Sequence, residues 1–182
     1  MAVESKVLPV GSKCPSFSLP SVDQKHYGLE DFSKSTGLLV AFICNHCPYV
    51  KAIEDRLIAI SRAFPVSDLQ VVGICSNDPV GYPEDAPEEL YARWKQKNYG
   101  FPYLIDSTQK AAVDFGAACT PDLFLYDQQR RLYYHGRIDD SWKDPARVTK
   151  EELKAAVKSL LVGAPAPVLQ INTIGCSIKW KN

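Results

Sequence analysis

Two cysteines separated by two residues are the side chains of this sequence best suited to covalent chemistry. Cys44 and Cys47 lie in the segment Cys-Asn-His-Cys-Pro, where the apolar run of residues 37–43 gives way to a stretch of helical periodicity. Thiols this close together can alternate between a dithiol and a disulfide. We expect Cys44 to be the attacking thiolate at the N-terminus of the helix, stabilised by free backbone N–H groups and the helix dipole. Cys47, one turn on, would resolve the mixed disulfide.

Length and composition indicate one ordinary globular domain. The 182 residues are 46% hydrophobic and 23% charged, and 21 acidic residues balance 21 basic ones. We therefore expect neither nucleic acid nor a membrane as a partner. The N-terminus lacks the layout of a signal peptide, and no apolar run approaches the ~20 residues that span a bilayer. We expect a cytoplasmic protein, whose six cysteines favour redox or metal chemistry over a disulfide scaffold.

The pattern of apolar residues predicts alternating strands and helices. The single expected domain comprises an irregular N-terminal arm with a small hairpin (1–36), a core (37–163) and a C-terminal tail (164–182). The expected core elements are, in order, a strand over 38–44, a helix from Pro48 to Phe64, a strand over 69–74, a helix over 87–98, a strand over 101–105, a helix over 108–115, a hairpin of strands 122–126 and 131–135, and a helix that begins with a capping box at Thr149 and Glu152 and ends at Gly163. This order predicts an α/β fold with a central mixed sheet and helices on both faces.

Motifs along nearly the whole chain resemble those of one family. They are Phe-Ile-Cys-Asn-His-Cys-Pro-Tyr-Val-Lys at 42–51, Ser-Asn-Asp at 76–78, Tyr-Pro-Glu-Asp at 82–85, Cys-Thr-Pro-Asp at 119–122, His-Gly-Arg-Ile-Asp-Asp at 135–140 and Gly-Cys-Ser-Ile-Lys-Trp at 175–180. Together with the order of the elements, they resemble the peroxiredoxin-like thioredoxin proteins. The resemblance implies a thioredoxin-like fold. It says less about function, because one fold serves many activities.

The resemblance also implies roles for residues around the two cysteines. His46 stands where the isomerase and periplasmic-oxidase branches of the fold carry histidine, so it would stabilise the Cys44 thiolate and make the disulfide more oxidising. An exposed residue of small electrostatic effect is the alternative interpretation of His46. Thr120-Pro121 matches the threonine and cis-proline that face the CxxC pair in thioredoxins. Thr120 would present its backbone to a substrate strand by β-augmentation.

One position departs from thioredoxin. Thioredoxins carry a buried carboxylate six residues before the first cysteine, which assists deprotonation of the second, and this chain has Leu38 there. The proton of Cys47 must therefore pass to water or to another group. We nominate Glu54 and Asp55 for this role.

The dipeptide Cys47-Pro48 supports a second chemistry. In peroxiredoxins the peroxidatic cysteine commonly precedes a proline in the first helical turn, and Cys47 aligns with it. Cys44 would then resolve the Cys47 sulfenate. The motif's threonine or serine and its proline are replaced here by Cys44 and Val40, and Arg137 is the one arginine that we nominate to polarise a peroxide. A slow two-cysteine thiol peroxidase therefore stays an alternative.

The four other cysteines carry weaker signals. Cys119 directly precedes Thr120-Pro121 and must lie near the edge of the site, as a redox partner, a metal ligand or a buried structural thiol. Cys176 lies in an apolar tail that must fold back. It either resolves a disulfide, in cis or across a dimer, or packs as a structural thiol. We expect Cys14 and Cys75 to be structural.

These observations favour a cytoplasmic thiol–disulfide oxidoreductase with antioxidant function that needs no metal or other cofactor. Its expected partners are protein or small-molecule disulfides, peroxides in the peroxidase alternative, and a thioredoxin- or glutathione-type reductant, and a homodimer stays open. A third hypothesis is a soft-metal protein similar to the Sco copper chaperones, with CxxC and His135 binding Cu(I) or Zn(II). Two structural cysteines buried in the core are the non-catalytic alternative.

Overall fold

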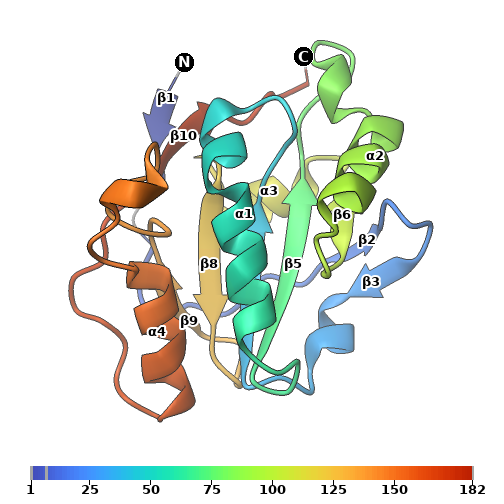
Figure 1. Ribbon diagram of the computed structural model, residues 1–182. Helices are drawn as coiled ribbons and strands as arrows, with labels where there is room; N and C mark the ends of the chain where they lie inside the picture. The colour runs from blue at the N-terminus through green and yellow to red at the C-terminus, as the bar shows by residue number, and fades with distance from the viewer. Residues whose placement is uncertain (1, 7, 182) are drawn as a thin grey trace.

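A computed structural model describes residues 2–6 and 8–181 of the chain (Figure 1). Its strands are β1 (Ala2–Glu4), β2 (Ser18–Pro20), β3 (His26–Gly28), β4 (Gly37–Phe42), β5 (Leu69–Cys75), β6 (Tyr103–Ile105), β7 (Cys119–Thr120), β8 (Asp122–Tyr126), β9 (Leu132–His135) and β10 (Ile174–Ser177). Its α-helices are α1 (Pro48–Ala63), α2 (Pro87–Lys97), α3 (Lys110–Phe115) and α4 (Glu152–Leu161). The alternation of strands and helices expected for residues 37–163 is confirmed.

The central sheet is mixed and is covered on both faces. Its strand order is β6-β5-β4-β8-β9, with β4, β5 and β6 parallel and with β8 antiparallel to both β4 and β9. Successive residues of β4 point to opposite faces, so Leu39 packs in one core cluster with Ile53 of α1 and Leu153 of α4. Leu38 packs in the other cluster, which includes Phe115 of α3. The expected sheet with helices on both faces is confirmed.

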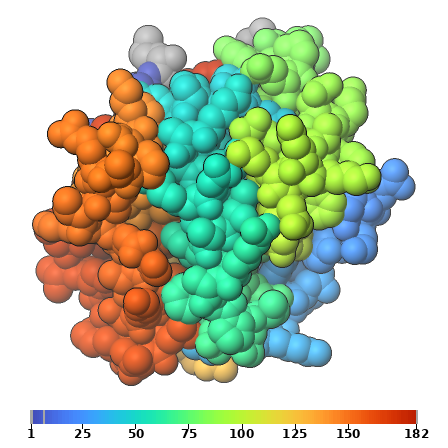
Figure 2. All heavy atoms as spheres, viewed as in Figure 1, coloured from blue at the N-terminus to red at the C-terminus, as the bar shows by residue number. Residues whose placement is uncertain are grey.

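Helix α1 follows β4 and lies across the front of the sheet. Pro48 occupies its first turn, where the missing N–H of proline costs no hydrogen bond. Its apolar residues Val50, Ile53, Leu57 and Ile60 recur every three or four positions, and this stripe is buried. The outer face of α1 stays at the surface, between α2 and the segment that carries α4 (Figure 2). No helix in the described part of the chain, α1 included, is long and apolar enough to cross a membrane.

The two ends of the chain meet beside the central sheet. Strand β10 lies between β1 and β7 and pairs antiparallel with both, so residues from the start, the middle and the end of the sequence form a second, three-stranded sheet. β1 and β10 lie side by side at the upper left of Figure 1, beside the upper end of α1. The hairpin expected in the N-terminal arm is β2–β3. Strand β10 lies in the tail expected to fold back, but no strand was predicted there.

One predicted helix start is wrong. Thr149 does not cap α4, which begins at Glu152 after Glu151 with no side-chain hydrogen bond at its cap. The Thr149 hydroxyl and backbone N–H instead donate to the carboxylate of Asp140. A nearby carboxylate is a charged acceptor, and it outcompetes the backbone N–H groups that a capping box would serve.

Candidate active site

The two cysteines of the CxxC pair occupy different backbone positions from those expected. Cys47, with φ −71° and ψ 122°, is the residue that caps the N-terminus of α1, and Cys44 lies three residues before it, in the loop after β4. Pro48 sets this boundary, because the residue before a proline is disfavoured in helical conformation. The expectation that Cys44 sits at the helix N-terminus is therefore wrong, and Cys47 sits there.

Both thiols face one turn of backbone. The Thr120–Pro121 peptide bond is cis, as the resemblance implied. Cys44 Sγ lies 3.2 Å from Thr120 Oγ1, and Cys47 Sγ lies 3.0 Å from the Thr120 carbonyl oxygen. Both cysteines are buried, with exposures of 1% and 0%, and both are free thiols. The structure thus brings the CxxC pair and the cis-proline turn together.

The environment of Cys47 favours a thiolate there rather than on Cys44. Hydrogen bonding from the Cys44 thiol lowers the pKa of Cys47, and the Cys176 thiol and the backbone N–H groups of Val50 and Cys176 act in the same direction, against burial. Burial raises the pKa of Cys44 well above that of a free thiol, and its hydrogen bond to Cys47 and the nearby Asp85 carboxylate add to this. These donors favour the thiolate on Cys47, and the two sulfurs share one proton; when Cys47 holds it, its S–H donates to the Thr120 carbonyl oxygen.

His46 is held by a buried carboxylate. Its Nδ1 lies 2.6 Å from Asp85 Oδ2 and 3.7 Å from Cys44 Sγ. Asp85 also accepts the backbone N–H of Asn45 at 2.7 Å and an amide N–H of Asn77 at 2.9 Å. Burial opposes the negative charge of Asp85, but the bonds from His46 and Asn77 outweigh it and lower the pKa of this carboxyl. His46 therefore reaches Cys44 as part of a His–Asp pair.

Neither Glu54 nor Asp55, which we nominated for the proton of Cys47, contacts the dithiol, and the buried carboxylate that lies nearby, Asp85, is bonded to His46 on the side of Cys44. Glu54 is buried and receives two hydrogen bonds of 2.7 Å from Arg93, while Asp55 is exposed on the outer face of α1. Neither of their carboxylates is bonded to a thiol. Asp85 was missed because it lies in the Pro-rich loop before α2, which carried no chemical signal beyond the Tyr-Pro-Glu-Asp motif.

Two further thiols border the pair. Cys119 is fully buried in β7, its Sγ 3.4 Å from the Pro121 carbonyl oxygen, and burial followed by the Asp122 carboxylate raises its pKa. This environment suits a structural thiol. Cys176 of β10 is half-buried and lies opposite Thr120 in the antiparallel pairing of β10 with β7.

The edge of β7 is already paired. Because β10 is hydrogen-bonded to β7 at Thr120, the backbone that we expected to receive a substrate strand is occupied by the chain's own tail. The expected β-augmentation requires β10 to leave first. In this structure β10 occupies the edge of β7 where a substrate strand would pair.

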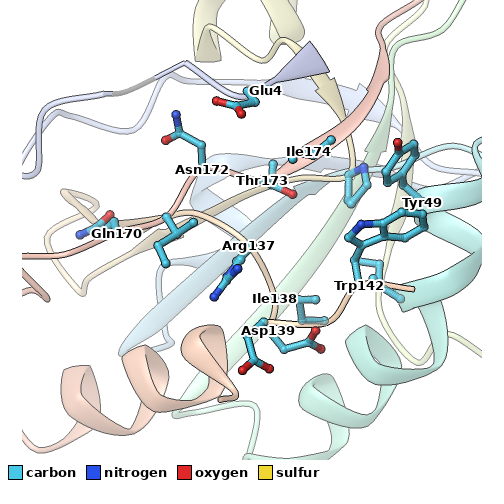
Figure 3. A pocket seen from close by; sticks show the side chains of 14 residues that line it. Glu4, Tyr49, Arg137, Ile138, Asp139, Trp142, Gln170, Asn172, Thr173 and Ile174 are labelled. Carbon is cyan, nitrogen blue, oxygen red and sulfur yellow. The ribbon is translucent and has the colours of Figure 1, made fainter. Parts of the chain in front are cut away.

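A cavity of about 440 Å³ opens beside the cis-proline turn (Figure 3). Tyr49 and Trp142 lie against each other on one side, with ring centroids 4.1 Å apart, and Gln170 and Asn172 lie on the other. Arg137 lines the same cavity, but its Nε donates to Glu152 at 3.0 Å. The guanidinium expected to polarise a peroxide is therefore neutralised by a carboxylate, and no contact joins it to either thiol in the described residues.

The ligand set expected for a soft metal is not assembled. His135 is buried between Asp122, which its Nε2 contacts at 2.7 Å, and the ring of Phe124, 4.2 Å from its own. Among the described residues, the donor atoms of Cys44, His46 and Asp85 lie within 4.8 Å of one another and could hold a metal ion. His46 and Asp85 already bond each other, however, so an ion would have to break that pair.

Comparisons with known proteins identify a family and structures of the same fold. Residues 10–135 match the model of the AhpC/TSA family. The crystal structure of an uncharacterized conserved protein from Geobacillus kaustophilus is 41% identical, with a TM-score of 0.94, and the match covers 100% of this chain and 97% of that one. The crystal structure of a hypothetical protein from Sinorhizobium meliloti is 42% identical, with a TM-score of 0.93, over 98% of each chain.

A more distant structure carries the fold alone. The thioredoxin domain of a thiol-disulfide oxidoreductase from Bacteroides vulgatus is 15% identical, with a TM-score of 0.60, and the match covers 71% of this chain and 89% of that one. It confirms the thioredoxin-like fold. A search of curated proteins found no match.

Proposed function

This chain belongs to the AhpC/TSA family, and on that premise we propose that it is a thiol–disulfide oxidoreductase working through Cys44 and Cys47. The observation that carries the proposal is the pairing of the two thiols with each other and with Thr120 of the cis-proline turn. A dithiol at a helix N-terminus can release two electrons by closing a disulfide, and that disulfide can accept two electrons, without a cofactor.

The reaction follows from the placement of one proton. Cys44 passes the shared proton to Cys47, whose S–H can donate to the Thr120 carbonyl oxygen, and the Cys44 thiolate attacks one sulfur of an external disulfide. The first substrate thiolate leaves and takes up the proton from Cys47, and a mixed disulfide forms on Cys44. The Cys47 thiolate then attacks the Cys44 sulfur, releases the second substrate thiolate and closes the Cys44–Cys47 disulfide. The substrate gains two electrons and the protein loses two.

The preferred substrates and partners follow from access to the dithiol. A small-molecule disulfide can enter from the cavity beside Pro121, whereas a protein disulfide needs β10 to move from β7. We propose a thioredoxin- or glutathione-type dithiol or thiol as the reductant that regenerates the pair, and the cytoplasm as the compartment.

Single substitutions at the pair test the proposal. Replacing Cys44 by serine keeps the shape of the side chain but removes the attacking sulfur, so Cys44→Ser should abolish reduction of insulin by dithiothreitol. Cys47→Ser should instead accumulate a mixed disulfide on Cys44, visible as a mass increase of the intact protein. Cys14→Ser, far from the pair, is the matched control and should keep full activity. Retained activity in Cys44→Ser would overturn the proposal.

One observation favours a second candidate, a thiol peroxidase. Cys47 holds the helix cap and the lowered pKa, and a thiolate at that position is where a peroxide would be reduced. Mapping the sulfur modified by one equivalent of hydrogen peroxide in the same variants separates the two. A fast reaction with a sulfenate on Cys47 supports the peroxidase, and a rate no better than that of a free thiol supports dithiol exchange.

A further inference from the structure

The C-terminal strand carries a third cysteine to the turn that both thiols of the dithiol face. In the register of β10 with β7, Cys176 lies directly opposite Thr120, the residue whose carbonyl oxygen is 3.0 Å from Cys47 Sγ. Cys176 packs against the core cluster that contains both Cys44 and Cys47, and its thiol and backbone N–H lower the pKa of Cys47. Cys47 is therefore flanked by two thiols, Cys44 on one side and Cys176 on the other.

The sequence of β10 allows it to pack closely against the cis-proline turn. Gly175 precedes Cys176, and a methyl group at its Cα would overlap the Thr120 carbonyl and lie 3.1 Å from Pro121 N. Only glycine lets the backbone of β10 approach the cis-proline turn this closely. On its other edge β10 pairs with β1, where Ala2 lies opposite Cys176. Pairing with β7 on one edge and with β1 on the other therefore fixes the position of Cys176 next to the dithiol.

Access to solvent separates the three sulfurs. Cys44 and Cys47 are 1% and 0% exposed, so an oxidised Cys44–Cys47 pair offers little surface to a reductant. Cys176 is half-buried, and it shares one side of β10 with Ile174, which lines the cavity beside Pro121. A disulfide that included Cys176 would present a partly exposed sulfur to the reductant.

We propose that Cys176 is a third redox-active cysteine, which exchanges with the Cys44–Cys47 disulfide to form a Cys47–Cys176 disulfide that the external reductant attacks. This rests on the proposed function of the pair. The Cys176 thiolate attacks the Cys47 sulfur, the Cys44–Cys47 bond breaks, and Cys44 leaves as a thiolate that takes up the proton lost by Cys176. The exchange is neutral in electrons. Two reductant thiols, attacking first at Cys176, then supply two electrons and two protons.

Disulfide mapping after oxidation tests the step. Reduced protein is treated with one equivalent of diamide, which converts two thiols into a disulfide, then alkylated under denaturing conditions and analysed by peptide mass spectrometry. We expect the Cys44–Cys47 disulfide in the native chain and the Cys47–Cys176 disulfide in Cys44→Ser. Cys44→Ser with Cys119→Ala should still form it, whereas Cys44→Ser with Cys176→Ala should not.

Kinetics on the otherwise intact dithiol give the second readout. Oxidised Cys176→Ala should be reduced by glutathione about tenfold more slowly than the native chain, because the reductant must then reach a buried sulfur. Failure of the native chain to form Cys44–Cys47 would defeat the proposed function itself. Formation of Cys44–Cys47 without any Cys47–Cys176 bond in Cys44→Ser, or an unchanged rate in Cys176→Ala, would defeat the role of Cys176 alone.

Discussion

Asp85 brings a buried negative charge to the Cys44 thiol through His46. The carboxylate is 2% exposed and accepts the Nδ1–H of His46 at 2.6 Å, which holds this ring nitrogen 3.7 Å from Cys44 Sγ. A carboxylate in this position keeps the imidazole oriented and stabilises it when it gains a proton. The same charge raises the pKa of Cys44, although burial raises it more. Asp85 therefore disfavours the Cys44 thiolate directly, but it favours that thiolate indirectly when His46 is protonated.

Asp85→Asn tests this role. The amide keeps the size of the side chain but cannot stabilise a protonated His46 beside the Cys44 thiolate, so the rate of disulfide reduction at pH 7 should fall by about tenfold for each pKa unit of stabilisation lost. The deficit should shrink towards pH 9, because solvent then removes the Cys44 proton unaided. The measurement is the pH profile of the reduction of a small disulfide under single-turnover conditions.

The matched control for this variant is Asp106→Asn. Asp106 is equally buried, at 1% exposure, and accepts bonds from Ser76 and from the backbone of Ala112. Its loss should cost stability without changing the pH profile. A deficit in Asp85→Asn that stays constant from pH 7 to pH 9 would mean that Asp85 is merely structural.

Of the residues at the site, the sequence could predict those that are recognisable within a short segment. The CxxC pair stands out by spacing, and Thr120-Pro121 by resemblance. Pro48 also makes Cys47, rather than Cys44, the residue that caps the helix. This local signal was available, but we used it only to place the first turn of the helix and not to identify the capping residue. Asp85 could not be found this way, because its bonds to Asn45 and His46 join residues about forty positions apart.

Among the elements, β10 controls the approach to the dithiol. It occupies the β7 edge, and Gly175 sets how closely it lies on Thr120. Gly175→Ala should push β10 off this edge, at a cost of about 1–3 kcal/mol in the free energy of unfolding. Each 1.4 kcal/mol by which the strand is weakened raises the open population about tenfold. Reduction of protein disulfides such as insulin should therefore become faster as stability falls.

The comparison variant is Gly81→Ala, since no atom lies within 4 Å of the methyl group it would add. It should leave the insulin rate and the urea midpoint unchanged. If Gly175→Ala is destabilised yet reduces insulin more slowly than the native chain, β10 supports the dithiol instead of covering it.

The strands differed in how well they could be predicted. β4 and β5 are long apolar runs buried on both faces, so their sequence alone marks them. The run Ile174–Ser177 contains a glycine and a serine and has one exposed residue, so its strand state comes from pairing with β1 and β7. The capping box at Thr149 failed for the same reason, because Asp140 offered a stronger non-local partner.

At the scale of the whole molecule, burial of thiols links stability to pH. Burial raises the pKa of Cys14 and of Cys75 to about 12 each. In the unfolded chain these thiols lose their protons near pH ~8.5. Because the folded protein keeps protons that the unfolded chain has released, the stabilising contribution is complete below that pH and is lost as the pH rises towards 12. Cys47, whose pKa is lowered, acts in the opposite sense and only below the pKa of a free thiol.

The fully reduced protein should therefore lose stability steeply in alkali. Above pH ~9 each of the two thiols lowers the free energy of unfolding by about 1.4 kcal/mol per pH unit. Urea titrations at pH 8, 9.5 and 10.5 with a phosphine reductant measure this slope. Burial also raises the pKa of Cys44 and Cys119, so Cys14→Ala and Cys75→Ala should each remove about 1.4 kcal/mol per pH unit from a larger total slope, although both lower stability at pH 8 by leaving a cavity. Cys176→Ala, which removes a half-buried thiol, should flatten it less. Equal slopes in the native chain and in both core variants would show that alkaline unfolding has another origin, such as the buried tyrosines.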